Sequence, residues 1–181
     1  HTISLTGKKV GMTSTSGVYI GEKCILKGDN TGPASAKLVL TNREVEAAVL
    51  ETARGGIVRK GLGYDLADVG VITNISEDHL GLDNVDTLED LAYVKSLVIE
   101  AVKPDGYAVI NADDLMADFL IKRARSKIIL FSKQKDNLLI KSHIKKGGRA
   151  VYVSDGIMYI HHEKGTLPLI KIENIPITMG G

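Results

Sequence analysis

The chain has 181 residues, of which 44% are hydrophobic and 25% are charged, and its formal net charge at pH 7 is +1. This length fits one domain or one and a half, and it is long enough to bury a substantial core. The near-neutral charge gives no sign of a nucleic-acid surface, and no apolar stretch approaches the length of a membrane span. The single cysteine, Cys24, excludes an internal disulfide framework and suits a reducing cytosol, so we expect a cytoplasmic protein.

The first third of the chain predicts a strand, a long loop, a helix and a second strand. Lys9–Thr15 is predicted as a short strand. Residues 16–34 contain several glycines, which favours a long loop with at most a small hairpin around Val18–Ile20. Ala34–Leu40 is predicted as a helix, and Glu46–Leu50 as a buried strand.

The remainder alternates strands and helices before it turns to strands alone. Asp68–Asn74 is a strand rich in β-branched residues. Thr87–Val102 is the clearest helix, because Asp86 and Thr87 can cap its start, and it is predicted to be closed by Pro104 and Gly106. The other predicted elements are a strand at 107–110, a helix at 114–125, a strand at 127–131 and short β segments from residue 149 onward.

This order of elements predicts an α/β fold. Strands that alternate with helices favour a mainly parallel sheet with helices on both faces. The C-terminal segments predict a small antiparallel β appendage. We therefore expect residues 1–148 to form the main part of a domain and residues 149–181 to be its β-rich continuation.

Two predicted strands are followed by residues that suit a binding site. Glu51 directly follows the strand at 46–50, and His79 comes shortly after Asn74. Ligands of open parallel sheets bind beyond the carboxyl ends of the strands, so we expect Glu51 and His79 on one edge. Either residue alone is more often a solvent-exposed charge or a loop or capping histidine. Their coincidence on one edge favours a functional site.

A lysine interrupts the apolar face of the helix predicted at 87–102. With 3.6 residues per turn, Lys95 falls in the middle of the apolar face. That face is formed by Leu88, Leu91, Ala92, Val98, Ile99 and Val102. A lysine there is costly unless its ammonium group reaches water or a partner. One explanation is that the stem packs while the ammonium stays hydrated, and the other is that the lysine is held near a ligand or metal.

Several segments together resemble the central ATP-binding domain of the Mur ligase superfamily, and most closely its cyanophycin-synthetase branch. They are KGDNTGPASAKLVL (27–40), AVLETARGGIVRKGLGYDLADVGVITNISEDHLGL (48–82), YVKS (93–96), GYAVINADD (106–114) and NIPITMGG (174–181). The motifs ETARGG and DHLGL are distinctive of that branch. Other members of the superfamily share only individual Glu, His, Lys and Asn positions. The resemblance implies a fold like that of the P-loop NTPases.

The resemblance also implies a reaction and its cofactors. In this family ATP phosphorylates a carboxylate, and an amine then attacks the acyl phosphate to form an amide. Glu51 is implied to hold a Mg²⁺ that bridges the ATP phosphates, and His79 to bind a second Mg²⁺. Lys95 is implied to be the lysine that family members carry as a carbamate, which would turn a cation into an oxygen-bearing anion. These three residues are the implied catalytic and metal-binding set.

Further residues are implied to bind the nucleotide and the acceptor. Asn111, with Asp113 and Asp114 behind it, matches the element that contacts the nucleotide base. Thr52 and Arg54 match positions that meet the acceptor, where Arg54 would place a positive charge near an anionic substrate. Gly55 and Gly56 are expected to let the backbone turn tightly after Glu51.

The chain departs from the family at its beginning and its end. The glycine-rich phosphate loop, which ends in Gly-Lys-Thr or Gly-Lys-Ser, and the C-terminal domain are not in the sequence. We expect a fragment of a cyanophycin-synthetase-like ligase that joins aspartate and arginine, inactive and weak in ATP binding by itself. Its expected partners are amino-acid substrates, a carboxylate-bearing acceptor and the remaining domains of its parent, with no nucleic acid or membrane. The sequence leaves open whether the protein forms a homo-oligomer.

Two alternatives remain at this point. One is a ligase domain of the peptidoglycan-precursor or folylpolyglutamate type. The other is a non-catalytic binding module that has lost its phosphate loop. The presence of Glu51, His79 and Lys95 counts against the module, because a decayed site has no physical reason to keep a lysine inside an apolar stripe.

Overall fold

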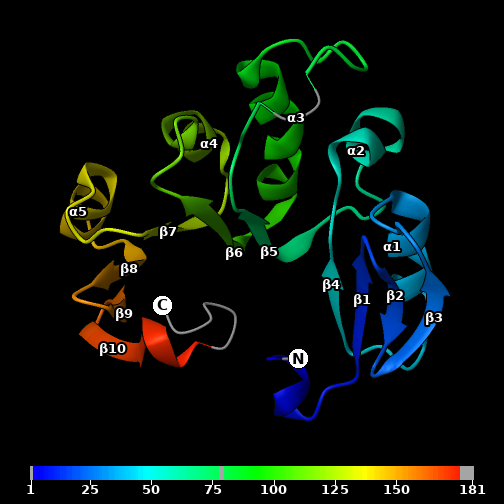
Figure 1. Cartoon of the computed structure of the whole chain (residues 1–181), viewed down its shortest axis with the longest axis horizontal. Helices are drawn as coiled ribbons and strands as arrows, with labels where there is room; N and C mark the ends of the chain where they lie inside the picture. Colours follow the sequence, from blue (N-terminus) through cyan, green and yellow to red (C-terminus); the bar gives the residue numbers. More distant parts are fainter. Residues whose placement is uncertain (1, 78–79, 176–181) are drawn as a thin grey trace. The chain divides into compact units, whose positions relative to one another are not determined.

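The computed structural model describes residues 2–77 and 80–175 and divides the chain into two compact units (Figure 1). The first unit comprises His1–Leu66 and Gly81–Asp86, and the second comprises Ala67–Leu80 and Thr87–Gly181. The elements are β1 (Val10–Ser14), β2 (Gly17–Ile20), β3 (Lys23–Lys27), α1 (Pro33–Leu40), β4 (Ala47–Leu50), α2 (Arg54–Lys60), β5 (Ala67–Ile72), α3 (Leu88–Glu100), β6 (Val102–Asn111), α4 (Ala117–Arg123), β7 (Lys127–Ser132), α5 (Leu138–Lys145), β8 (Arg149–Ser154), β9 (Ile157–His162) and β10 (Gly165–Lys171), with 3₁₀ turns at Ser4–Thr6 and Ile172–Asn174.

The first unit is built on a four-stranded sheet with the order β3-β2-β1-β4. β1 pairs antiparallel with β2 and parallel with β4, so that Thr13 lies opposite Leu50. α1 approaches β1 closely, because a Cβ atom at Gly11 would lie 2.4 Å from Cγ1 of Val39. The core of this unit consists of Val18, Ile20 and Val39, with Val45 and Leu50 packed against them.

The segment predicted as a long loop is mostly a β-hairpin. β2 and β3 are joined by a two-residue turn that begins at Gly21, whose φ is 59°. Glycine adopts positive φ readily, and such short turns suit the twist of hairpin strands. Val18 and Ile20 point into the core from β2. The small hairpin allowed around Val18–Ile20 thus extends to Lys27, and its length was underestimated because the many glycines obscured a short alternation of apolar residues.

The region around ETARGG differs from its prediction in two ways. The strand β4 is not buried, since Ala48 and Val49 are exposed. The reason is that β4 forms one edge of its sheet. Gly55 and Gly56 do not make a tight turn after Glu51 but lie within the helix α2.

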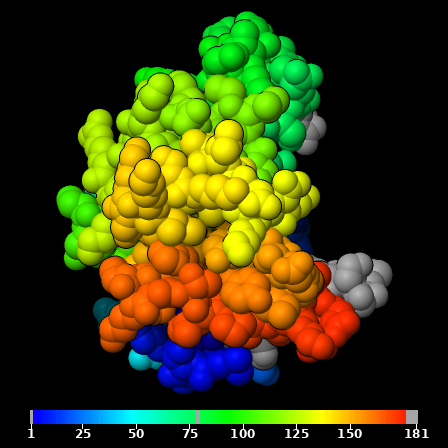
Figure 2. Space-filling model, turned by 90° about the vertical axis from the view of Figure 1, so that its left-hand side faces the viewer, coloured from blue at the N-terminus to red at the C-terminus, as the bar shows by residue number. Residues whose placement is uncertain are grey.

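The second unit is built on a six-stranded sheet with the order β10-β9-β8-β7-β6-β5. β5 to β8 run parallel, and β9 and β10 continue the sheet antiparallel. The predicted α/β class and the antiparallel C-terminal appendage are thereby confirmed. In Figure 1, α3, α4 and α5 lie along one face of this sheet, and Figure 2 shows α5 in yellow beside the orange and red strands β8 to β10. The core includes Leu91, Ile99, Ile110, Leu120, Leu130 and Ile140.

The helix predicted most clearly, α3, is confirmed. Thr87 caps it in a reciprocal capping box, in which its hydroxyl accepts from the backbone of Asp90 and the Asp90 carboxylate accepts from the backbone of Thr87. The helix ends at Glu100 instead of the predicted Val102, and Pro104 and Gly106 do not close it but lie inside the following strand β6. The eight-residue helix α5, capped by the side chain of Asn137, was not predicted. Among the described residues, no helix combines the length and the apolar composition that a membrane crossing requires.

Candidate functional site

The predicted site residues fall in both units, and each group is described within its own unit. The first unit holds Glu51, Thr52 and Arg54. The second holds Lys95, Asn111, Asp113 and Asp114. His79 lies outside the described residues. Within residues 2–77 and 80–175, no three His, Cys, Asp or Glu side chains gather as a metal site.

Glu51 stands at the carboxyl end of β4, as predicted. Its backbone N–H donates to the carbonyl of Thr13 at 3.2 Å, which continues the parallel pairing with β1. Its carboxylate accepts one long hydrogen bond, from the backbone N–H of Thr15 at 3.3 Å, and the residue is exposed. The carboxylate therefore keeps open lone pairs of the kind that Mg²⁺ prefers.

Thr52 lies beside a tyrosine that the sequence analysis missed. Its hydroxyl oxygen lies 3.3 Å from the carbonyl oxygen of Leu50, and it shares a side-chain hydrogen bond with Tyr64. Burial raises the pKa of the Tyr64 hydroxyl, and the bond to Thr52 opposes this only in part. Tyr64 is brought here by a loop that packs on α1, where a Cβ atom at Gly63 would lie 2.7 Å from Cα of Pro33. No spacing pattern in the sequence signals this contact.

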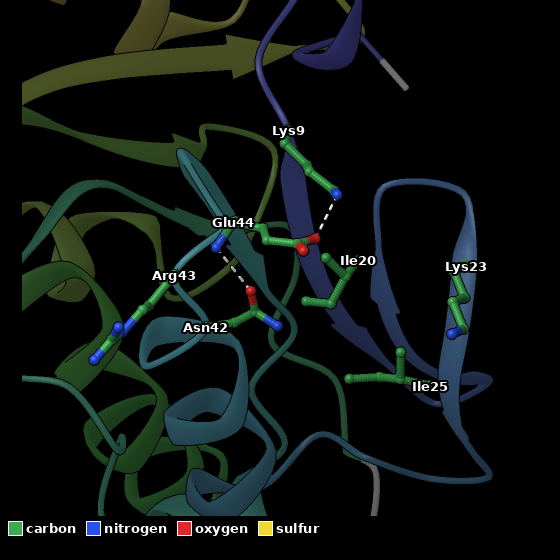
Figure 3. Close-up of a pocket in the computed structure, with 7 residues that line it drawn as sticks. All are labelled: Lys9, Ile20, Lys23, Ile25, Asn42, Arg43 and Glu44. Atoms are coloured by element: carbon green, nitrogen blue, oxygen red, sulfur yellow. Dashed lines mark hydrogen bonds and ion pairs between the residues drawn. The ribbon is translucent and has the colours of Figure 1, made fainter.

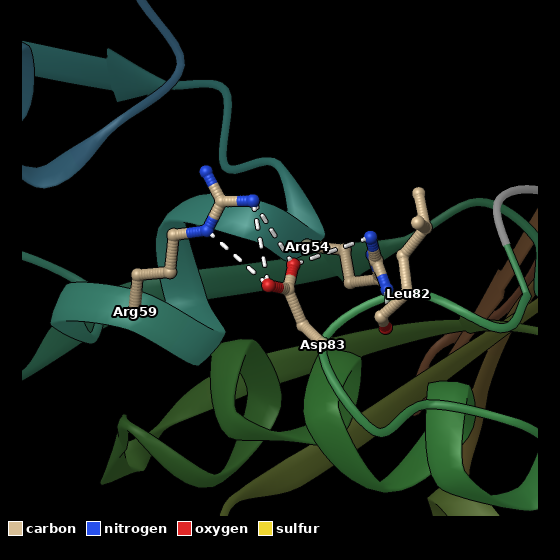
Figure 4. Close-up of polar contacts among 4 residues, drawn as sticks. All are labelled: Arg54, Arg59, Leu82 and Asp83. Atoms are coloured by element: carbon tan, nitrogen blue, oxygen red, sulfur yellow. Dashed lines mark hydrogen bonds and ion pairs between the residues drawn. The ribbon is translucent and has the colours of Figure 1, made fainter.

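Arg54 opens α2 and binds the segment Gly81–Asp86 of the same unit (Figure 4). Its Nη1 donates to the carbonyl of Leu82 at 2.7 Å, and its Nη2 lies 3.5 Å from Oδ2 of Asp83. Arg59, five residues later on α2, also pairs with Asp83, at 3.2 Å. The Arg54 side chain is only 12% exposed. Asp83 was not among the predicted residues, because an aspartate in a turn is ordinary in a sequence.

Asn111 is the last residue of β6, and its side chain bonds to the segment that follows the neighbouring strand β5. Its side-chain amide donates to the carbonyl of Thr73 at 2.9 Å, just beyond the end of β5. Its side-chain oxygen accepts from the backbone N–H of Asp113 at 2.9 Å. The residue thus lies at the carboxyl ends of two parallel strands, where ligands of such sheets bind.

The carboxylate of Asp113 is held by three donors of the protein. Ser132 Oγ donates to it at 2.6 Å, the backbone N–H of Lys133 at 2.7 Å and the amide of Asn137 at 2.9 Å. Partial burial works to raise the pKa of Asp113, but these hydrogen bonds outweigh it and hold the pKa below its ordinary value. The side chain ties the end of β6 to the start of α5.

The carboxylate of Asp114 is also engaged with the backbone. It accepts from the N–H of Ile75 at 2.5 Å and from the N–H of Met116 at 2.8 Å. The first bond joins positions 39 apart in sequence, so Asp114 holds the chain that leaves β5. Both aspartates therefore shape the loops at this edge.

Lys95 lies on the buried side of α3, at a helical position between those of Leu91 and Ile99, and its side chain is half-buried. The buried residues of the helix are Leu91, Ala92, Ser96 and Ile99. Ser96, at the margin of that face, is fully buried, although the helical wheel did not include it in the apolar face. The wheel treated a serine as polar and placed it elsewhere, but a small residue can enter the core when its hydroxyl is bonded.

The hydroxyl of Ser96 belongs to a polar cluster between α3 and α4 that was also not predicted. It lies 2.8 Å from Oε1 of Glu100 and 2.8 Å from Nε of Arg123. Arg123 pairs with Glu100 at 2.7 Å, and its guanidinium stacks over the ring of Tyr93 at 4.3 Å. This arrangement satisfies every member and fastens the two helices together.

The first unit also contains a hollow of about 470 Å³ (Figure 3). Lys9 precedes β1 and Glu44 precedes β4, so this hollow opens at the amino ends of those strands. Lys9 and Glu44 point toward each other and form an ion pair, and the hydrogen bond from Lys9 holds the pKa of Glu44 below its ordinary value. None of the predicted site residues lines it.

One known family matches nearly the whole chain, and known proteins match all or part of it. The family model described as the Mur ligase middle domain matches residues 2–175. Cyanophycin synthetase of Geminocystis herdmanii (strain PCC 6308) is 49% identical over 179 residues, which are 99% of this chain and 20% of that protein. The UDP-N-acetylmuramoylalanine–D-glutamate ligase of Caldanaerobacter subterraneus is 32% identical over 109 residues, 60% of this chain and 21% of that protein. The chain spans about a fifth of the length of these relatives.

Solved structures share the fold. A UDP-N-acetylmuramoyl-L-alanyl-D-glutamate–2,6-diaminopimelate ligase aligns with a TM-score of 0.67 at 22% identity, over 93% of this chain and 34% of that one. The MurF ligase of Thermotoga maritima in complex with ADP aligns with a TM-score of 0.54 at 19% identity, over 92% of this chain and 35% of that one. These likenesses confirm the predicted fold.

Proposed function

Because the chain belongs to the Mur ligase middle domain family, we propose that it is the ATP-binding part of an ATP-dependent ligase that joins an acid to an amino acid. The observation that carries the proposal is the identity of 49% to a cyanophycin synthetase over 99% of the chain. On this basis the whole protein joins aspartate and arginine through an acyl phosphate. Its partners are these amino acids, a carboxylate-bearing acceptor and the rest of the parent protein, and its compartment is the cytoplasm.

The residues of the first unit suit the anionic substrates of such a reaction. The open carboxylate of Glu51 is a hard oxygen ligand, which fits Mg²⁺. Bound Mg²⁺ would supply the neutralisation of phosphate charge that phosphoryl transfer needs. Arg54 adds a guanidinium group three residues later, and Thr52 adds a hydroxyl, so we propose that these two meet the acceptor.

The residues of the second unit are proposed to serve the nucleotide and the second metal. We propose Asn111 as the direct contact of the base, with Asp113 and Asp114 setting its loop, because both carboxylates are already bonded to the protein. Lys95, half-buried on α3, is proposed as the carbamate site, together with His79 as a metal ligand. Residues 149–181 are proposed to continue the domain of residues 1–148, which the pairing of β8 with β7 supports.

Two other functions are weaker candidates. A peptidoglycan-precursor ligase is favoured only by the identity of 32% to a D-glutamate ligase over 60% of the chain. A folylpolyglutamate-type ligase is a weaker candidate than the peptidoglycan-precursor ligase. A non-catalytic module would have no need of an open carboxylate at Glu51 beside a half-buried arginine.

The test uses the full-length parent protein and measures ADP release. We expect release that depends on both aspartate and arginine, and a loss of about 100-fold in kcat in Glu51→Gln, because a metal-held phosphate loses several kcal/mol of stabilisation. Glu22→Gln, a change at an exposed turn, is the matched control and should leave kcat unchanged. Release that depends on D-glutamate instead would support the peptidoglycan alternative, and no release with any amino acid would support the module.

A further inference from the structure

The segment Gly81–Asp86 contains a tight turn that fixes the place of one carboxylate. Asp83 and Asn84 have φ values of 56° and 58°, and Leu82 and Val85 form a β-bridge around them. Two central residues with positive φ are the mark of a two-residue hairpin turn, and aspartate and asparagine tolerate this region better than other side chains. Val85 is 3% exposed and anchors the turn. The backbone therefore sets where the Asp83 carboxylate lies.

Arg54 is held by two adjacent residues of that turn. One guanidinium nitrogen bonds to the carbonyl of Leu82 and another pairs with the carboxylate of Asp83, as Figure 4 shows. An arginine side chain has several rotatable bonds, and a fixed guanidinium loses less freedom when it binds a ligand. At 12% exposure the group is also shielded from most of the solvent, which strengthens its interactions.

The charges of this cluster do not cancel. Arg54 and Arg59 share one carboxylate, so the cluster carries one net positive charge. Arg59 is 68% exposed and its pairing is screened by water. Arg54 is therefore the member that is both fixed in place and still attractive to an anion.

We propose that Asp83 is a positioning residue that orients Arg54 toward a carboxylate of the acceptor. The inference rests on the proposed function of Arg54, and it adds that the turn Gly81–Asp86 determines the affinity for the acceptor. Asp83 acts through Arg54 and does not itself touch the substrate.

The experiment compares steady-state kinetics of the full-length parent and its Asp83→Asn variant. We expect the KM for the acceptor to rise about tenfold, with kcat and the KM for ATP within twofold, because a misoriented guanidinium weakens one binding contact. Asp83→Glu, which keeps the charge, should recover at least part of the affinity. In an Arg54→Ala background, Asp83→Asn should have no further effect on KM, because the group through which it acts is gone.

The matched control is Asp68→Asn, which makes the same chemical change in the exposed ion pair of Asp68 with Lys103 and should leave all constants unchanged. The inference is overturned if Asp83→Asn leaves the KM unchanged, or if its effect persists undiminished in the Arg54→Ala background. A fall in kcat together with a rise in both KM values and a lower melting temperature would also overturn it, since that combination indicates only a structural role. If the parent releases no ADP at all, the proposed function fails before this question arises.

Discussion

At the scale of single residues, the two aspartates after Asn111 do structural work that their sequence position alone does not reveal. Each carboxylate of the Asn111–Asp114 segment accepts hydrogen bonds from backbone groups of loops that are distant in sequence. Hydrogen bonds to a charged group are stronger than those between neutral groups. The nucleotide-binding element that the family resemblance implies is thus also a junction of three loops at one sheet edge.

Asp113 should give the stability of the protein a measurable dependence on acid pH. Its pKa is lowered in the folded state, so its stabilisation is complete above the unfolded-chain value of about 4 and is lost as the pH falls through the lower folded value. Asp113→Asn should cost about 1 kcal/mol near neutral pH and show a smaller loss of stability on acidification. Urea unfolding at several pH values measures both effects. Asp65→Asn, at an exposed carboxylate, is the control, and equal pH slopes for wild type and Asp113→Asn would contradict the assignment.

At the scale of elements, two glycines that look alike in the sequence have opposite roles. A Cβ atom at Gly70 of β5 would lie 2.4 Å from the backbone oxygen of Val98 on α3, whereas a Cβ atom at Gly55 of α2 would meet nothing within 4 Å. The packing of α3 on β5 thus depends on the absence of a side chain at Gly70. In α2, the glycine only adds flexibility to the helix.

The two substitutions to alanine should therefore change stability in opposite directions. Gly70→Ala should destabilise the protein by about 1–3 kcal/mol, because α3 has to move away from its strand. Gly55→Ala should stabilise it by about 0.5–1 kcal/mol, because alanine is the better helix residue and no neighbour is disturbed. Denaturant unfolding of both variants is the measurement. A Gly70→Ala variant as stable as the wild type would show that the α3–β5 contact is not close in solution.

At the scale of the whole molecule, each unit has a hydrophobic core of its own. Val39 is fully buried in the first unit and Leu130 nearly so in the second. Val39→Ala should cost about 2 kcal/mol and Leu130→Ala about 2–5 kcal/mol, through lost burial and the cavity left behind. We expect hydrogen exchange to accelerate mainly in β1, β2 and β4 for the first variant and in β6 and β7 for the second. Equal acceleration throughout the chain in both variants would mean that the two units open as one.

The sequence predicted the positions of most strands and helices because their signals are local. Capping residues and helical periodicity located α3, and β-branched runs located β5 and β7. Its errors have local causes too. Glycines hid the extent of the hairpin of β2 and β3, and the wheel for α3 left out Ser96, which is buried. Burial of β4 was overestimated because an edge position depends on strand order, which a single apolar run does not contain.

By itself, the sequence determined the α/β class through its periodicity and the family through its distinctive motifs. It also determined the placement of Glu51 and Asn111 at strand ends, because both directly follow predicted strands. The tertiary structure decided which residues of the chain contact one another. That Asp83 binds Arg54, that Tyr64 lies beside Thr52 and that Asp114 holds Ile75 depends on contacts between residues 12 to 39 positions apart. Such contacts arise from the packing of elements, which no short stretch of sequence specifies.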